Sequence, residues 1–144
     1  MNWKTAYRSF YYENAAEPED PVLATDETAL LIIDIQNTYL QPSNDPNEAA
    51  RWQPFYERMN NQVIPNTAKL IQDARKCGVE VIFARIACLK DDGRDRSLSQ
   101  KKPGFNYLLM PQNSDESQIV PELQPVNDDI CITKTTDSAL TGTN

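Results

Sequence analysis

Two charged side chains, Asp34 and Lys134, each stand at the end of a short apolar segment and are the first candidates for catalysis. A carboxylate beside an ammonium group in a partly dry cleft can take a proton from a nucleophile and stabilise the charge that develops. Both positions also have a plain structural explanation, because Asp is common in the turn after a strand and Lys is common in contact with solvent. A shared site therefore requires that the fold bring the two segments to one edge.

The absence of histidine narrows the chemistry more than any residue that is present. Without it, the chain has no Ser-His-Asp or Cys-His nucleophile and no histidine-containing zinc site of its own. Catalysis must then use carboxylates, lysine or thiols. Cys77, Cys88 and Cys131 are odd in number and lack CxxC spacing, which indicates reduced thiols in a cytoplasmic protein. We expect buried packing residues at Cys77 and Cys131, whereas Cys88 falls just beyond a predicted strand and is the one contender for a nucleophile.

Short apolar runs and one helical pattern supply the elements that must position these residues. Residues 28–34 and 79–84 are continuous apolar runs, typical of strands covered on both faces of a parallel sheet. Between them, residues 63–76 carry apolar side chains at three- and four-residue steps, which predicts an amphipathic helix that stops at Gly78. Residues 130–134 predict a third strand. The sequence therefore predicts an α/β fold with a parallel sheet.

This arrangement predicts where the charged residues lie and what the sheet lacks. In open α/β sheets ligands gather outside the carboxyl ends of the strands, so we expect Asp34 and Lys134 to meet there at neighbouring strand tips. Three strands with one crossover helix leave one sheet face poorly covered, and the sequence stops where another helix should begin. We therefore expect a domain truncated after its third strand. Such a sheet recruits partners, which predicts a homo-oligomer or association with the missing C-terminal part.

The remaining segments carry no sustained period. Residues 1–27 combine aromatic side chains with an acidic, proline-bearing stretch, and we expect an N-terminal arm that packs across a surface of the domain, residues 28–144. Residues 88–118 are polar and too long for a plain connection, which is typical of functional or mobile loops. Residues 119–123 predict one helical turn.

Composition excludes several classes of partner. The 144 residues suffice for one domain, and 14 Lys+Arg against 21 Asp+Glu give a formal net charge of −7. Nucleic-acid binding needs clustered Lys and Arg, so we expect neither nucleic acid nor an anionic membrane as a partner. No apolar run approaches about 18 residues and the N-terminus does not resemble a signal peptide, which predicts a cytoplasmic location. No glycine pattern of nucleotide binding occurs, so no cofactor and no metal are expected.

Four segments, taken in order, carry a resemblance to a known family. Residues 28–37 hold an apolar run followed by Asp-x-Gln, and residues 63–78 hold the helical pattern closed by Gly. Residues 118–125 form a proline-bounded turn, and residues 134–143 contain Lys, then Ser-Ala, then Thr. In this order they resemble the isochorismatase-like cysteine hydrolases, which include ureidoacrylate, biuret and carbamoyl-amide hydrolases. The resemblance implies a Rossmann-like three-layer α/β/α fold.

The resemblance also implies a role for each candidate. Asp34 would be the general base toward a cysteine thiol, and Lys134 would orient the pair and stabilise the thiolate. Gln36 and Asn37 would lie near the pocket for the small-molecule substrate, although amides at such positions often only satisfy nearby backbone. The cysteine would attack an amide-type carbonyl of a ureido or carbamoyl substrate and form a covalent intermediate that water hydrolyses. The family places this cysteine after one more crossover unit, about 30 residues further on, so we expect this chain to lack the nucleophile.

Two other functions stay open at this point. An isochorismate-type vinyl-ether hydrolase relies on the acid and does not need the thiol. A non-catalytic binding or regulatory relative would complete its core by association and would tolerate the loss of Asp34 or Lys134. The absence of histidine argues against nicotinamide as the substrate, because nicotinamidases of this family use histidine-rich metal sites.

Overall fold

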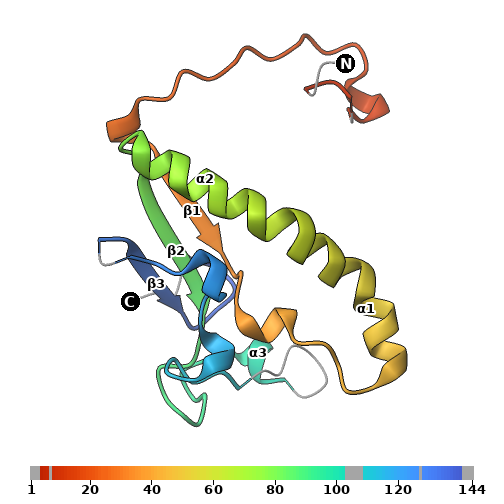
Figure 1. The fold of residues 1–144 in the computed structure, drawn as a ribbon, viewed down its shortest axis with the longest axis vertical. Coiled ribbons are helices and arrows are strands. Elements are labelled where there is room, and N and C mark those ends of the chain that lie inside the picture. Colours follow the sequence, from red (N-terminus) through yellow and green to blue (C-terminus); the bar gives the residue numbers. More distant parts are fainter. Residues whose placement is uncertain (1–3, 7, 103–108, 127, 141–144) are drawn as a thin grey trace.

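The computed structural model describes residues 4–6, 8–102, 109–126 and 128–140 (Figure 1). Its sheet has three strands, β1 (Ala29–Ile33), β2 (Glu80–Ile86) and β3 (Ile130–Lys134). They pair in parallel in the spatial order β1-β2-β3. The predicted α/β class with a parallel sheet is therefore confirmed, and each predicted strand segment matches an observed strand to within two residues.

A long helical segment connects β1 to β2. It consists of α1 (Pro46–Arg58), a π-helical turn (Met59–Val63) and α2 (Ile64–Lys76). The helix predicted over residues 63–76 is α2, so that prediction is confirmed. Helix α1 is not expected from the sequence pattern; it begins where Asp45 Oδ1 accepts a hydrogen bond from the backbone N–H of Asn47 at 2.8 Å. Pro54 lies inside α1 and masks it in the sequence, because proline normally interrupts a helix.

The hydrophobic core lies between α2 and one face of the sheet. Side chains alternate across a strand, and those facing α2 come from alternate positions of β1 and β2. The buried cluster comprises Ile32, Ile64, Ile71, Val81, Phe83, Ile119, Val120 and Leu123. The core therefore fixes the register of the strands, because a slip of one residue would move these side chains to the opposite face.

The opposite face of the sheet is open in part. Leu31, Ile33 and Ile130 point to this face and are 41%, 50% and 48% exposed. Within the described ranges no second layer of helices covers it, and β1 has a strand partner on one side alone. The described part of the fold is thus one helical layer on a sheet, with an apolar face and a strand edge still accessible.

The long polar segment after β2 is partly ordered by short elements. Cys88 forms an isolated bridge with Pro111, and α3 (Leu98–Lys101) follows the turns of residues 91–97. The helical turn predicted over residues 119–123 is observed as a 3-10 turn, Pro121–Leu123. This segment lies at the edge of the sheet where the strands end, as Figure 1 shows for α3.

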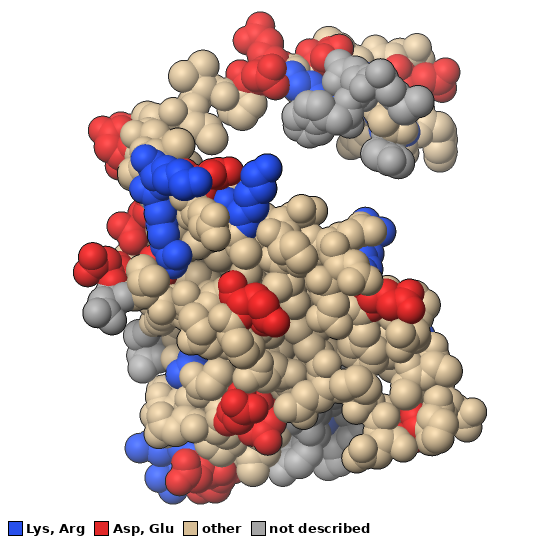
Figure 2. Space-filling model, viewed as in Figure 1, with Lys and Arg blue, Asp and Glu red and all other residues tan. Residues whose placement is uncertain are grey.

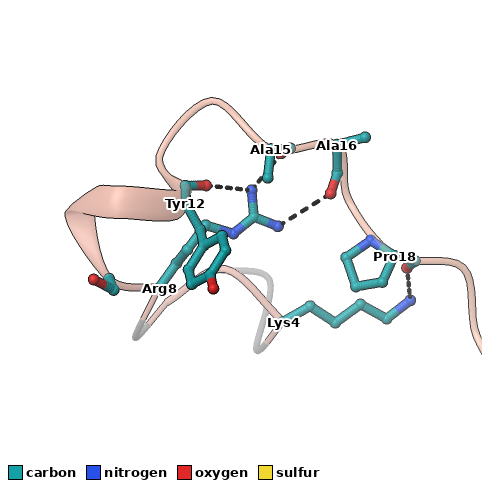
Figure 3. Close-up of a pocket in the computed structure, with 7 residues that line it drawn as sticks. Lys4, Arg8, Tyr12, Ala15, Ala16 and Pro18 are labelled. Carbon is teal, nitrogen blue, oxygen red and sulfur yellow. Dashed lines mark hydrogen bonds between the residues drawn. The ribbon is translucent and has the colours of Figure 1, made fainter.

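The described residues of the N-terminal arm do not pack across the domain, so that prediction is wrong for them. Its residues from Ser9 to Glu27 are exposed, including Phe10 at 87% and Tyr11 at 78%. The arm instead folds onto itself, because Arg8 donates to the carbonyl of Ala15 at 2.5 Å and Lys4 Nζ donates to that of Pro18 at 2.7 Å (Figure 3). Basic side chains satisfy local carbonyls there, and an extended segment connects this lobe to β1 (Figure 1).

Charged side chains are spread thinly over the helical face. Figure 2 shows isolated acidic groups on a largely uncharged surface and a gathering of basic groups where α2 ends. Arg75 and Lys76 lie in that last turn, where cations interact favourably with the helix dipole. Among the described residues, no helix is both long enough and apolar enough to cross a bilayer.

Candidate active site

Asp34 and Lys134 meet at the carboxyl ends of the strands. Lys134 Nζ donates to Asp34 Oδ2 at 2.7 Å and to the backbone carbonyl of Asp137 at 2.9 Å. The Lys134 side chain has no exposed surface, whereas the Asp34 side chain is 34% exposed. The ammonium therefore lies in a dry environment that strengthens its attraction to the carboxylate, while the Asp34 side chain as a whole is only partly buried.

The two residues lie on the outer strands rather than on neighbouring ones, so the expectation of neighbouring strand tips is wrong. β2 lies between β1 and β3, which separates the outer backbones by about 9–10 Å at the usual strand spacing. Lys134 pairs in register with Ile86, the last residue of β2. Its long side chain reaches across the end of β2 to the carboxylate, and the ion pair thereby connects all three strand ends.

The backbone of Asp34 is what makes this contact possible. Its N–H still donates to the carbonyl of Ala84 at 2.9 Å, so strand pairing continues up to this residue. By alternation its side chain would follow Ile32 toward α2, whereas Lys134 belongs to the opposite face. Asp34 has a φ of 56°, in the left-handed region that Asp and Asn tolerate better than most residues. We attribute the turn of the carboxylate toward Lys134 to this conformation.

Asp34 also lines an open cleft beside β1. The cleft has a volume of about 620 Å³, and its walls are the end of β1, the turn after it and one side of the long helical segment. Most of its lining is apolar: Ile33, Ile35, Leu40, Phe55, Met59 and Val63. Asp34 Oδ1 is buried and has no hydrogen-bond partner among the described residues. A buried carboxylate oxygen without a hydrogen-bond partner is a candidate proton acceptor for a group that comes into contact with it.

Gln36 holds the strand ends together with its side-chain amide. Nε2 donates to the carbonyls of Ile86 and Ser117 at 2.9 and 2.8 Å, and Oε1 accepts from the N–H of Ile86 at 2.8 Å. The residue is fully buried, and both of its N–H donors are used. Although Gln36 contributes to the cleft wall, this geometry supports the backbone-fixing interpretation of its role.

Asn37 begins the 3-10 turn that follows β1, Asn37–Leu40. Its Nδ2 donates to the carbonyl of Asp115 at 2.8 Å, and its backbone N–H donates to that of Gln118 at 3.0 Å. Asn37 does not line the Asp34 cleft but a neighbouring cavity that Asp115 also lines. A direct contact of Gln36 or Asn37 with substrate stays a prediction.

Cys88 lies beneath the loop that follows β2. It is 1% exposed, its N–H donates to the carbonyl of Met110 at 2.7 Å, and its carbonyl accepts from the N–H of Gln112 at 2.9 Å. Among the described residues that line the Asp34 cleft there is no cysteine. Cys88 is therefore the buried packing residue, and its proposed role as nucleophile gains no support from the geometry.

Cys77 and Cys131 are exposed, so the expectation that both are buried is wrong. Cys77 follows the last turn of α2. Cys131 shares a small cavity with Arg85 on the α2 side of the sheet. Partial desolvation of the thiol and the nearby carboxylate of Asp129 raise the pKa of Cys131 above its usual value, and Arg85 offsets this in part. A raised pKa keeps the thiol protonated and a poor nucleophile.

Tyr39 is a cleft residue that the sequence pattern does not indicate. It follows Asp34 in the turn after β1 and lines the same cleft. Burial raises the pKa of its phenol, the carboxylates of Asp34 and Asp137 raise it further, and Arg96 opposes them. A single tyrosine in a polar turn gives no periodic signal, so only the three-dimensional structure identifies it.

We expect the Asp34→Asn substitution to lower the pKa of Tyr39, because it removes a negative charge that opposes ionisation of the phenol. Carbon-13 NMR of labelled tyrosine rings would follow the titration, with Asp73→Asn on exposed α2 as the matched control. Because folding raises the pKa of Tyr39, the free energy of unfolding should fall as the pH rises above about 10, where the tyrosine ionises in the unfolded chain. The Tyr39→Phe substitution should remove the part of this fall that comes from Tyr39. An unchanged Tyr39 titration in Asp34→Asn would contradict the proximity of the two groups.

Comparison with known proteins shows which family the chain belongs to. The family model of the isochorismatase domain matches residues 28–144. Ureidoacrylate amidohydrolase RutB of Agrobacterium fabrum is 28% identical, and the match covers 90% of this chain and 60% of that protein. RutB of Acinetobacter baylyi is 27% identical, over 83% of this chain and 52% of that protein. The chain thus spans about half to three fifths of the length of these relatives.

Solved structures show the same fold. An isochorismatase family protein from Desulfovibrio vulgaris aligns with a TM-score of 0.56 and 27% identity, over 81% of this chain and 56% of that one. A cysteine hydrolase from Pseudomonas syringae aligns with a TM-score of 0.62 and 20% identity, over 84% of this chain and 52% of that one. The family match extends over most of the chain and includes Asp34 and Lys134. The chain therefore belongs to the isochorismatase family.

Proposed function

We propose that this chain carries the acid–amine half of a cysteine-type hydrolase that cleaves a carbon–nitrogen bond of a small amide or ureido substrate. The observation that carries the proposal is that the two carboxylate oxygens of Asp34 have different surroundings. Oδ2 is bound by the buried ammonium of Lys134, while Oδ1 is unpartnered. One oxygen is thus fixed and the other is free to accept a proton. The similarity to ureidoacrylate amidohydrolases supports the choice of an amide substrate.

The proposed mechanism uses these positions. A cysteine thiol transfers its proton to Asp34 Oδ1, and the thiolate attacks the carbonyl carbon, with the developing charge stabilised by Lys134 and by backbone N–H groups. The carbon–nitrogen bond then breaks, and the amine leaves with the proton that Asp34 returns. Water hydrolyses the resulting thioester, which releases the acid and restores the thiol.

The open edge of β1 supports a location for the nucleophile. A parallel strand paired there would end beside Asp34, at the same sheet edge as the ion pair. No cysteine of the described residues lines the Asp34 cleft, so we infer that the thiol comes from outside residues 1–144. The exposed apolar side chains of Leu31 and Ile33 support association of β1 with such a segment or with a second copy of the chain. All three cysteines are free, in keeping with a reducing, cytoplasmic location.

The direct test compares the 144-residue chain with a protein extended by the codons that follow residue 144 in the gene, here called the extended protein. Ammonia release from ureidoacrylate and from simple ureido acids should occur with the extended protein and be negligible with the 144-residue chain. An extension that lacks a cysteine near the end of the next strand, or an extended protein that releases no ammonia, would defeat the proposal.

A vinyl-ether hydrolase of the isochorismate type is the second candidate. The same cleft favours it, because Asp34 lines the cleft and no cysteine is among its described lining residues. Such an enzyme would release pyruvate from its substrate without covalent attachment to the protein. Assaying the extended protein for ammonia and for pyruvate in parallel separates the two reactions.

A further inference from the structure

A second cavity, here called the α3 pocket, lies beside α3 and is rich in cations. Its volume is about 210 Å³, and Arg94, Arg96, Lys101 and Gln100 line it with a single acidic residue, Asp92. The chain as a whole carries a formal net charge of −7. Three cations around one small cavity therefore form a local positive region within an acidic protein, which favours an anionic ligand.

Arg96 is a buried cation that no anion of the described residues neutralises. It is 6% exposed, its Nε donates to Gln100 Oε1 at 3.3 Å, and its Nη2 is buried without a partner among the described residues. The other partly buried arginine with an unused N–H, Arg75, does have an ion-pair partner in Asp129. A buried charge without a counter-ion is costly. An anionic ligand bound in the α3 pocket would stabilise the guanidinium of Arg96 by serving as its counter-ion.

The mouth of the α3 pocket carries the other two cations. Arg94 Nη1 lies 3.5 Å from Asp92 Oδ2, and both side chains are largely exposed. Lys101 Nζ donates to the carbonyl of Arg94 at 2.6 Å, which holds its ammonium at the pocket. Gly93 has a φ of 67°, and a Cβ at this position would lie 2.9 Å from Leu109 Cδ1. The loop that presents these cations is therefore closely packed at its turn.

Hydrogen bonds connect the α3 pocket to the acid–amine pair. The buried side chain of Gln100 receives Arg96 on its oxygen and donates through Nε2 to Asp137 Oδ1 at 2.6 Å. The carbonyl of Asp137 in turn accepts from Lys134 Nζ at 2.9 Å. Three residues, Arg96, Gln100 and Asp137, would thus lie between such an anion and the ammonium that holds Asp34.

We propose that the α3 pocket binds a small oxyanion, a carboxylate or a phosphate group, with Arg96 as its main ligand and Arg94 and Lys101 at its mouth. The planar guanidinium fork of arginine matches both groups, because each presents two oxygens to paired N–H donors. The oxyanion is either a carboxylate of the substrate held in the Asp34 cleft or a free ion. The proposal concerns binding and does not depend on hydrolysis.

The test uses thermal unfolding of the 144-residue chain with inorganic phosphate, at an ionic strength kept constant with sodium chloride. At phosphate concentrations of about 100 times the dissociation constant, the wild-type midpoint should rise by about 5–10 °C. Arg96→Gln should bind phosphate about 10- to 100-fold more weakly, because it removes a charged hydrogen-bond donor. Arg51→Gln, on the exposed face of α1, is the matched control and should respond like the wild type.

Two outcomes would overturn the proposal: no rise in the wild type, or the same rise in Arg96→Gln. If Arg96→Gln does not fold, Lys101→Gln at the pocket mouth serves instead and should weaken phosphate binding by several-fold. Asp34→Asn should leave phosphate binding unchanged, which keeps this test independent of the hydrolase proposal.

A second arm identifies the source of the oxyanion. Succinamate carries an amide and a carboxylate, whereas butyramide has a similar length and no charge. Tighter binding of succinamate by about tenfold, lost in Arg96→Gln and reduced by competing phosphate, would indicate a substrate carboxylate. Phosphate binding with no preference for succinamate would indicate a free ion. Failure of both ligands to bind would overturn the site.

Discussion

Replacing Asp34 by asparagine is expected to lower amide hydrolysis by the extended protein by about 10³-fold. The amide cannot accept the thiol proton that the unpartnered Oδ1 would take, but it can still accept the hydrogen bond from Lys134. The left-handed conformation of residue 34 also suits asparagine, so the backbone should not change. Ammonia release under saturating and limiting substrate would measure the loss in kcat and in kcat/KM.

Two controls separate this effect from unfolding. Asp34→Asn leaves the buried ammonium of Lys134 without a charged partner, which should cost about 2 kcal/mol of stability, less than for a fully buried pair because Asp34 is partly exposed. Asp73→Asn makes the same substitution on the exposed side of α2 and should retain full activity. An Asp34→Asn protein that stays folded and keeps a tenth or more of the wild-type rate would refute the general-base role.

Gln36→Leu is expected to have the largest effect on stability, a loss of about 4 kcal/mol in the free energy of unfolding. Leucine has a similar size but removes three buried hydrogen bonds, to both backbone groups of Ile86 and to the carbonyl of Ser117. These groups are far from solvent and would lose a partner that water cannot replace. The shift in the urea midpoint would measure the cost.

The matched control for this substitution is Gln53→Leu on α1. Gln53 donates to Glu57 Oε1 at 3.0 Å on the exposed side of the helix, where water can satisfy both groups. Its replacement should change the unfolding free energy by less than about 0.5 kcal/mol. Equal midpoints for the two variants would show that Gln36 does not hold the strand ends, and its amide would then be free to contact substrate.

The meeting of Asp34 and Lys134 followed from the sequence because both residues end apolar segments that pair in parallel. The sequence did not predict that the Lys134 side chain reaches across the end of β2 to contact Asp34. Strand order is set by tertiary pairing, and nothing in the local pattern reveals that β2 lies between the two. The left-handed turn at Asp34 is equally hidden, since asparagine and aspartate tolerate that conformation without requiring it.

Residues recruited from loops were the least predictable part of the site. Tyr39 and Arg96 have no periodic neighbours, and their roles depend on burial that only the folded loops create. Helix α1 was hidden by Pro54, although Asp45 and Pro46 form an ordinary helix start. The N-terminal arm was misread because aromatic residues usually indicate packing, whereas here Arg8 and Lys4 organise a lobe from backbone carbonyls.

In a regular strand, the register that packs the hydrophobic side chains also fixes the direction of every other side chain. The left-handed conformation of Asp34 at the end of β1 separates the direction of the carboxylate from that register. Elsewhere in β1 the direction of a side chain is dictated by the pleat, so any change of register would carry a functional group to the wrong side. At Asp34 the direction is set by one backbone torsion instead. The hydrophobic side chains of β1 can therefore diverge and repack in evolution or in design while the acid keeps its orientation.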